Sequence, residues 1–575
     1  MRDSRSASQI LFGHLPQQTV DVRGGIWKVK NWKCTPVHEV DAEALAAELI
    51  KLARPWEETG RDGKFVARLR AGSNVQVRSL DRELGIWMEA FPRTWRCKRC
   101  RRLHDRPKAT CKCGSKGPHG QLPFVLFHDA CGEIREPSYP RCPTHDDVEM
   151  RLPGTTSLRE IELKCPTPGC GTRLPSRFLH TRCTCGVPGR RGDNGELMEF
   201  TVHRGASVYV PRGVVIVNPP SRSQRRRLVA SGGSQAALIW MADGMTAPWV
   251  DGIAGGQTAA LRRLLTEQGR SPQQIEAALA AMGDIEEQPR ELDVSPAVRQ
   301  LAEAEAAALA LATAETRQTL EDLRRTAIGA RLALYENAYV SALKRARFQS
   351  VDLVERFPIL NGQFGYTRGD HEPGASRLRN FTERDGTIVI YGDLATTEAL
   401  VTRLDPVAVV RWLIQRGHGH GLAEYEDHRD AYEAILQAMG DAPETSDVLA
   451  DLTVLIHSLS HRMVRQTSFY AGIDRESISE LLFPMALAFV TYAVPRGDFV
   501  LGGLQAMIEH DLHTVLDRVV YDESRCALDP GCWDSAHGAA CAVCLHLGEP
   551  SCRLFNTRLD RKVLFDVDGY FKVGL

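Results

Sequence analysis

Cys97-Lys-Arg-Cys100 and, after ten intervening residues, Cys111-Lys-Cys113 make up the stretch that decides the fold of the N-terminal part of the chain. A structural zinc ion takes four deprotonated ligands in a tetrahedron, and two short cysteine turns joined by a hairpin supply that geometry. The spacing therefore predicts a zinc ribbon whose ligands are Cys97, Cys100, Cys111 and Cys113.

The composition is that of a globular protein with several domains. The chain has 575 residues, of which 43% are hydrophobic and 25% charged, and this length exceeds what one hydrophobic core usually organises. Its 72 Lys+Arg balance 72 Asp+Glu, so the total charge indicates no particular partner. The N-terminal residues lack the apolar core of a secretory signal, and we expect a cytoplasmic protein. In that reducing compartment, 16 cysteines favour metal binding over disulfides.

A second cysteine set follows the first. Cys165 and Cys170 flank a Pro-Thr-Pro-Gly turn, and Cys183-Thr-Cys185 repeats the CxC ending of the first set. These four cysteines predict a second four-ligand zinc site. Between the two sets lie Cys131 and Cys142, with His128 and His145 nearby, and three interpretations stay open. The four residues could form a third site, exchange with the neighbouring sets, or include plain buried thiols.

The C-terminal region offers five candidate ligands for a site that has room for four. Cys541 and Cys544 form the firmest pair, and we expect Cys552 and Cys532 to complete it, with Cys526 left over or replacing Cys532. Sites made entirely of cysteine are closed to substrate, so all of these sites are predicted to be structural. We expect two to four zinc ions in total.

The expected fold class is α+β and multidomain. It combines N-terminal zinc-ribbon modules, a helical insertion, and a C-terminal mixed α/β domain that ends in a cysteine zinc site. The predicted segments are 1–92 (an N-terminal α/β segment), 93–190 (the zinc-ribbon region), 191–221 (a β element), 222–350 (the helical insertion) and 351–575 (the C-terminal domain).

Periodicity and capping residues place several elements within these segments. Ser271 and Gln274 are spaced to form a capping box around Pro272 at a helix start. The expected helices are 41–53, 400–416, 446–465 and, as a buried core helix, 481–494, and the expected strands are 73–79, 387–391 and two within 206–217, joined by a Pro-Arg-Gly turn.

The chain lacks the phosphate-binding sequences of nucleotide enzymes. It has no G-x-x-x-x-G-K-[ST] run and no strand followed by G-x-G-x-x-G, so we do not expect an ATPase, or an enzyme of another class. His457-Ser-Leu-Ser-His461 has the zincin spacing of two histidines, but Ser458 stands where the general base would be. One interpretation is a hydrogen-bonded histidine pair. The alternative is a metal-dependent nuclease or hydrolase that uses His457, His461 and Glu480.

Basic residues are concentrated around the first cysteine set. Between Arg93 and Lys116 there are ten Lys/Arg and a single acid, Asp105. Cations on a rigid knuckle can neutralise phosphates, and an aromatic side chain can stack on a base. A solvated face that contacts an acidic partner protein is the competing interpretation. The predicted nucleic-acid-binding residues are Arg93, Trp95, Arg96, Lys98, Arg99, Arg101 and Arg102.

Several short motifs, taken in order, resemble a known family. They are Ala206-Ser-Val-Tyr-Val-Pro, Gly365-Tyr-Thr-Arg368, Leu455-Ile-His457-Ser-Leu-Ser-His461 followed by Glu480, and the C-terminal CxxC, Cys552 and Asn556-Thr-Arg-Leu-Asp560-Arg561. The last of these is similar to the cysteine module of Mrf-type DNA helicases. This order without a helicase motor resembles the DrmB family of the bacterial DISARM anti-phage system.

The resemblance implies a partner, a separate DrmA-type helicase that the chain would join in trans, and a role in defence against foreign DNA. It leaves residues 222–350 uncovered, and Tyr-Val-Pro stands where Tyr-Tyr-Pro is expected. We therefore expect a non-catalytic zinc-binding accessory subunit of a DNA helicase or translocase, supporting DNA binding and complex assembly. A free-standing DNA-binding protein is a further alternative.

Overall fold

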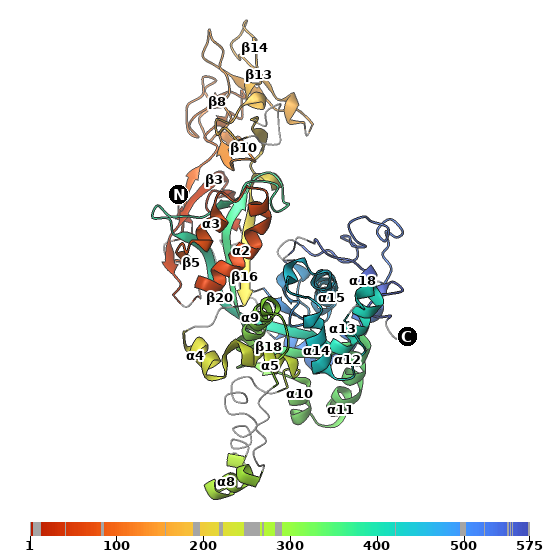
Figure 1. Ribbon diagram of the computed structural model, residues 1–575. Coiled ribbons are helices and arrows are strands. Elements are labelled where there is room, and N and C mark those ends of the chain that lie inside the picture. The colour runs from red at the N-terminus through yellow and green to blue at the C-terminus, as the bar shows by residue number, and fades with distance from the viewer. Residues whose placement is uncertain are drawn as a thin grey trace. The chain divides into compact units, whose positions relative to one another are not determined.

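The structure is a computed structural model of the whole chain (Figure 1). The residues that it describes are 2–3, 13–38, 40, 42–81, 85–155, 157–187, 196–217, 222–246, 265–266, 270–281, 290–419, 421–494, 502–522, 524–548, 551–552, 554 and 556–572.

The chain divides into two compact units. The first unit contains Met1–Ile216 and Leu360–Asp393, and the second contains Val217–Ile359 and Leu394–Leu575. Two long strands, β18 (Phe348–Thr367) and β20 (Ile388–Leu404), therefore contribute residues to both units. The sequence-based boundary at residue 351 differs from this division, because part of the predicted C-terminal domain returns to the first unit.

The first unit begins with a four-stranded sheet in the order β1-β6-β3-β2. Its inner face packs in a core that includes Leu15, Val29, Trp32 and Ile86. Elsewhere in this unit β5 pairs in parallel with the start of β20 and antiparallel with β4. The elements are β1 (Arg2–Asp3), β2 (Thr19–Val22), β3 (Gly25–Trp32), β4 (Cys34–Pro36), β5 (Val75–Leu80), β6 (Ile86–Ala90), and the helices α2 (Ala42–Glu58) and α3 (Phe65–Arg70).

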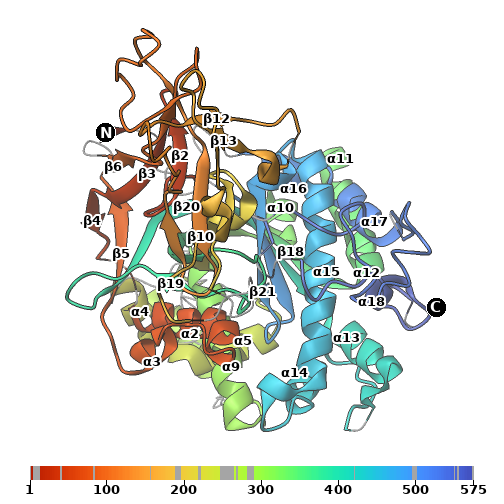
Figure 2. The ribbon, with the colours of Figure 1, turned by 90° about the horizontal axis from the view of Figure 1, so that it is seen from above.

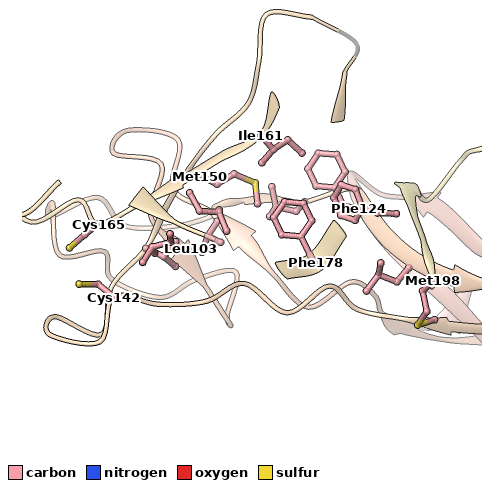
Figure 3. Close-up of a cluster of buried hydrophobic side chains, with 14 of the residues drawn as sticks. Leu103, Phe124, Cys142, Met150, Ile161, Cys165, Phe178 and Met198 are labelled. Carbon is pink, nitrogen blue, oxygen red and sulfur yellow. The ribbon is translucent and has the colours of Figure 1, made fainter. Parts of the chain in front are cut away.

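Three small sheets form the cysteine-rich part of the first unit. Their orders are β8-β7-β9, β11-β10-β15 and β12-β13-β14. A shared apolar core joins them, and in Figure 3 the sulfur atoms of Cys142 and Cys165 face each other at one end of it. The strands are β7 (Trp95–Arg96), β8 (Leu103–His104), β9 (Gly120–Gln121), β10 (Phe124–His128), β11 (Glu133–Arg135), β12 (Glu149–Arg151), β13 (Glu162–Lys164), β14 (Arg173–Leu174) and β15 (Glu199–Val202), with short 3-10 turns at η1 (Leu158–Glu160) and η2 (Arg177–His180).

Two of the family-like motifs meet inside the first unit. Tyr209, from the Tyr-Val-Pro segment, stacks on Tyr366 with ring centroids 4.7 Å apart. The fully buried Arg368 guanidinium lies over both rings, at 5.5 and 4.9 Å. Its Nε donates to the Gly132 carbonyl at 2.9 Å. These motif residues therefore hold the core of this unit together.

The second unit has a sheet part in which β20 pairs with β22 (Ala488–Ala493) and β22 with β21 (Ile478–Phe483), both antiparallel. Helix α15 (Asp447–Tyr470) packs along β21 and β22, as Figure 2 shows for β21. Its buried face includes His457 and His461. The other helices of this unit are α4 (Arg222–Ala230), α5 (Gly233–Ala242), α8 (Pro272–Ala281), α9 (Pro296–Thr313), α10 (Leu320–Thr326), α11 (Gly329–Ala333), α12 (Val340–Ala346), α13 (Pro406–Leu413), α14 (His428–Gln437), α16 (Gly503–His510), α17 (Leu512–Tyr521) and α18 (Lys562–Phe565), with π-helical turns at η4 (Leu334–Tyr339) and η5 (Ile414–His418), 3-10 turns at η6 (Pro443–Thr445) and η7 (Arg475–Ser477), and the short strand β17 (Arg317–Gln318).

The expected fold class is confirmed, since the structure mixes helices and strands and carries several cysteine clusters, one of them C-terminal. The predicted capping box is present as well. Ser271 Oγ accepts from the Gln274 amide at 3.3 Å, and Gln274 Oε1 accepts from the Ser271 amide at 3.0 Å.

Three sequence-based element predictions are wrong. Residues 481–494 form the β21–β22 hairpin instead of a helix, because Pro484 cannot continue a helix and Leu487 takes a left-handed φ of 51° in the turn. Residues 206–217 form a 3-10 turn, η3 (Ala206–Val208), and one strand, β16 (Val210–Val217), since Pro211-Arg-Gly continues the strand instead of turning. Residues 400–404 are the end of β20, and the helix starts only at Pro406, capped by Asp405.

Among the described residues, no helix combines the length and the apolar character needed to cross a bilayer.

Candidate metal centres and nucleic-acid interface

The first cluster consists of Cys97, Cys100, Cys111 and Cys113, as the sequence predicts. Strands β7 and β8 carry the first knuckle, in which the Arg101 amide donates to the Cys97 carbonyl at 3.0 Å. In the second knuckle the Gly114 amide donates to the Cys111 carbonyl at 2.8 Å. The sulfur atoms of Cys97 and Cys113 are 3.8 Å apart, and those of Cys100 and Cys111 are 3.2 Å apart.

The predicted second site is divided between two clusters. The structure places Cys183 and Cys185 with His128 and Cys131, which we term the second cluster, and Cys165 and Cys170 with Cys142 and His145, which we term the third cluster. Of the three interpretations left open, exchange with the neighbouring sets is therefore the one observed. The reason is topological. His128 ends β10 and Cys131 lies in the turn to β11, and both strands belong to a sheet that also contains β15, the strand after Cys185.

Both mixed clusters present the Nδ1 atom of a histidine to cysteine sulfurs. His128 Nδ1 lies 3.3 Å from Cys131 Sγ and 3.4 Å from Cys185 Sγ. His145 Nδ1 lies 3.5 Å from the sulfurs of Cys142 and Cys165. The sequence carries a signal for these ligands in two mirrored spacings, His-x-x-Cys at 128–131 and Cys-x-x-His at 142–145. Each spacing is typical of one half of a zinc site.

The fourth cluster consists of Cys526, Cys532, Cys541 and Cys544. The expected set included Cys552, with Cys526 left over or replacing Cys532. Its assignment of Cys552 is wrong, because Cys552 lies beside His457 and Cys526 takes the fourth position. Sulfur separations within the fourth cluster are 3.6 Å for Cys526–Cys541 and 3.7 Å for Cys532–Cys544.

The four clusters fit tetrahedral metal coordination. A zinc–sulfur distance of about 2.3 Å requires ligand sulfurs to lie about 3.8 Å apart, close to the separations observed here. None of the cysteines forms a disulfide. Thiolate-rich sets of four with one or no histidine are the donor sets of structural zinc sites. These clusters can therefore hold metal ions, and their donor chemistry suits zinc.

Local hydrogen bonds favour the thiolate form of one cysteine in the first cluster and of one in the third cluster. Burial opposes ionisation of Cys97, but the amides of Cys100 and Arg99 outweigh it and lower the pKa of Cys97 to about 6. The Thr172 hydroxyl and amide lower the pKa of Cys170 to about 6. A metal ion would stabilise the remaining ligands as thiolates in the same way, through its positive charge.

Arg561 of the C-terminal motif supports the fourth cluster. Its side chain is fully buried, and its Nη2 donates to Asp529 Oδ1 at 2.6 Å. Its Nη1 donates to the Ser524 carbonyl at 3.0 Å. The guanidinium also lies 5.3 Å from the centre of the Trp533 ring. Arg561 therefore ties together the loops that carry Cys526 and Cys532.

The first cluster presents an exposed basic surface. Of the predicted nucleic-acid-binding residues, Lys98, Arg99 and Arg101 are exposed. Arg93 is exposed but paired with Glu136 at 3.3 Å. The residues that are exposed and form no ion pair within the described part of the chain are Lys98, Arg99, Arg101, Arg106, Lys108 and Lys116, and we call them the knuckle cations.

Three predicted nucleic-acid contacts are corrected by the structure. Trp95 is only 8% exposed and lies within strand β7, so it cannot stack on a base in this conformation. Arg102 is half-buried, and its Nε donates to Asp147 Oδ2 at 3.0 Å. Arg96 is also half-buried, and burial lowers its pKa. The residues left for phosphate contact are the knuckle cations.

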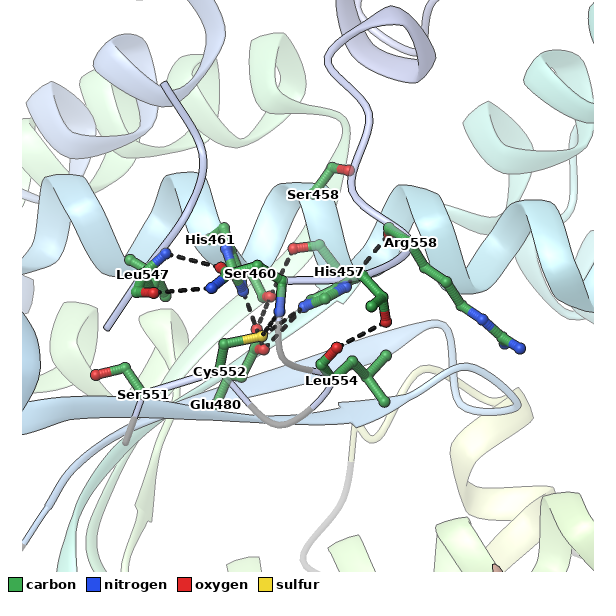
Figure 4. Close-up of polar contacts among 12 residues, drawn as sticks. His457, Ser458, Ser460, His461, Glu480, Leu547, Ser551, Cys552, Leu554 and Arg558 are labelled. Carbon is green, nitrogen blue, oxygen red and sulfur yellow. Dashed lines mark hydrogen bonds and ion pairs between the residues drawn. The ribbon is translucent and has the colours of Figure 1, made fainter. Parts of the chain in front are cut away.

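A fifth group of possible ligands, the histidine cluster, contains His457, His461, Glu480 and Cys552 (Figure 4). Burial acts to raise the pKa of Glu480, but the two histidines outweigh it and hold the pKa well below its usual range. Burial acts to lower the pKa of His461, but the Glu480 carboxylate raises it to about 9. His457, His461 and Glu480 have no exposed surface, so a DNA strand cannot reach them in this conformation.

A family model described as a domain of unknown function (DUF8724) matches residues 6–210, less than half of the chain. This range contains the first three clusters and the knuckle cations, and it ends before the fourth cluster and the histidine cluster. No curated protein matches the chain.

Proposed function

We propose that this protein is a non-catalytic zinc-binding accessory subunit of a DNA helicase or translocase. The observation that carries the proposal is the combination of closed thiolate-rich clusters with the exposed knuckle cations on the first of them. Each of the four cysteine-rich clusters would hold one Zn²⁺. The zinc ions would supply folding energy to loops that have little regular structure of their own.

The knuckle cations support sequence-independent contact with nucleic acid. Lys98 and Arg99 lie within the turn between the ligands Cys97 and Cys100. Metal binding by these two cysteines would therefore hold the backbone of Lys98 and Arg99 in place. Phosphate contacts of this kind set affinity and register and carry no sequence information. The protein would therefore bind DNA with strong salt dependence and little sequence preference.

The proposed partner is a DrmA-type helicase, and the proposed setting is bacterial anti-phage defence. Both rest on the family-like motifs. In this structure the motif residues Tyr209, Tyr366, Arg368 and Arg561 serve as core and loop anchors, which agrees with a scaffold role. Motor activity would come from the partner.

DNA binding by the purified full-length chain tests this proposal. We expect similar affinities for unrelated duplex sequences and a steep loss of affinity with salt. Strong discrimination between sequences would instead support a free-standing specific DNA-binding protein. Cleavage of the DNA in the presence of added metal would support the nuclease alternative.

A further inference from the structure

The histidine cluster has features of a metal site that differ from those of the four cysteine-rich clusters. It is built by three segments of the second unit. His457 and His461 lie one helical turn apart on α15, Glu480 lies on β21, and Cys552 follows the fourth cluster along the chain. The histidines and Glu480 are completely buried, and Cys552 is 3% exposed.

The donor atoms converge on one point. His457 Nε2 and His461 Nε2 each lie 3.1 Å from Glu480 Oε1, and His457 Nε2 lies 3.3 Å from Cys552 Sγ. Zinc bonds of about 2.0 Å to nitrogen and oxygen and about 2.3 Å to sulfur give tetrahedral edges of roughly 3.3–3.6 Å. The observed separations lie close to these edges. Figure 4 shows the four side chains pointing toward one another between the helix and the strand.

Each donor also has an outer partner that fixes its orientation. His461 Nδ1 lies 2.8 Å from the Leu545 carbonyl, and His457 Nδ1 lies 3.3 Å from the Arg558 carbonyl. The Ser460 hydroxyl donates to Glu480 Oε2. The Asn556 amide donates to Cys552 Sγ at 3.1 Å. Metal-bound histidines and carboxylates are held in this manner by a surrounding shell of hydrogen bonds.

The hydrogen bonds decide where the histidine protons lie. A carbonyl oxygen only accepts, so the Nδ1 atoms of both rings carry hydrogen, and in a neutral ring Nε2 is then a bare lone pair. Without a cation, the Nε2 lone pairs of the two neutral rings would face Glu480 Oε1, which lies 3.1 Å from each of them. Such an arrangement of acceptors without a donor is costly in the protein interior.

A divalent cation removes this conflict. It accepts the lone pairs of two neutral histidines and balances the charges of one carboxylate and one thiolate, so that the buried group is neutral overall. We propose that His457, His461, Glu480 and Cys552 bind a single Zn²⁺ ion in a closed site. Nitrogen, oxygen and sulfur donors in a tetrahedron suit zinc, and four protein ligands leave no position for a substrate.

The site would fasten the C-terminal cysteine module to the α/β part of the second unit. Leu545, whose carbonyl orients His461, directly follows Cys544 of the fourth cluster. Cys552, which follows Cys544 by eight residues, supplies the sulfur ligand. The ion therefore joins helix α15 and strand β21 to a segment that has few regular elements of its own.

Native mass spectrometry of the full-length chain loaded with Zn²⁺ tests the proposal. The four cysteine-rich clusters and the histidine cluster predict five ions per wild-type chain. Cys552→Ala should lose one ion, and the control Cys34→Ala, at a thiol outside all clusters, should lose none. Four ions in the wild type, or five in Cys552→Ala, would overturn the proposal.

A second measurement needs no variant and therefore survives misfolding of Cys552→Ala. Cadmium-113 NMR of the wild-type chain loaded with Cd²⁺ should show one resonance well upfield of the thiolate-rich sites, because a single sulfur contributes to the histidine cluster. A spectrum that contains only thiolate-rich resonances would contradict the site. Failure of the four other clusters to bind metal would instead count against the proposed function.

Discussion

Replacing three knuckle cations should change the salt dependence of DNA binding by a calculable amount. Each phosphate contact contributes about −0.9 to the slope of log K against log salt for duplex DNA, so contacts from all six knuckle cations give a slope of about −5. The triple variant Lys98→Gln, Arg99→Gln, Arg106→Gln retains three and should have a slope of about −3. Arg101 is left unchanged because its backbone has a left-handed φ of 65° within the knuckle.

The difference is large enough to measure by fluorescence anisotropy. Between 50 and 200 mM salt, wild-type affinity should fall by about three orders of magnitude and that of the variant by about forty-fold. The matched control replaces Arg151, Arg173 and Arg182 by Gln, which changes the net charge equally. Each of these arginines is already paired with a glutamate. An unchanged slope in the knuckle variant, or an equal change in the control, would refute the assignment of this surface.

Three further predictions concern stability and metal. Arg561→Ala should lower the free energy of unfolding by about 2–3 kcal/mol in denaturant titration, because it removes the guanidinium that donates to Asp529 and to the Ser524 carbonyl. An unchanged midpoint would show that the loops are held by other contacts. Gly365→Ala should lower the free energy of unfolding by about 1–3 kcal/mol, since an added Cβ would lie 2.6 Å from the Arg379 carbonyl oxygen. The control Gly154→Ala, whose added Cβ would meet no atom within 4 Å, should leave the melting temperature unchanged. Removal of zinc by a chelator should unfold the cysteine-rich part of the first unit, which hydrogen exchange would show as a loss of amide protection in residues 95–185. Acid should promote the loss of zinc because it protonates the thiolate ligands. Unchanged protection after verified metal loss would mean that the apolar core alone keeps this part folded.

Ligand types were predictable from the sequence, whereas their grouping depended on tertiary structure. The CxxC and CxC pair of the first cluster lies within one small local sheet, β8-β7-β9, so local spacing was sufficient to group its ligands. Cys183 and Cys185 join His128 across more than 50 residues, because β10 and β15 pair in one sheet. No local pattern encodes that pairing.

The C-terminal ligand assignment failed for a similar reason. Cys552 is close in sequence to Cys544, and proximity favoured placing it in the fourth cluster. Packing of α15 against β21 places His457, His461 and Glu480 next to Cys552. The zincin-like spacing of the two histidines was visible in the sequence, but its partner in the C-terminal module was not. Trp95 illustrates the same limit, since its burial depends on the sheet that β7, β8 and β9 form.

The measurement that tests the central claim most directly is copurification of this chain with a DrmA-type helicase, followed by assay of ATPase activity with and without DNA. We predict a complex that is stable at moderate salt and whose DNA-stimulated ATPase activity depends on this chain. The knuckle triple variant should still assemble but should require more DNA to reach the same activity. Failure of the two proteins to copurify, or ATPase activity that is indifferent to this chain, would contradict the proposed accessory role.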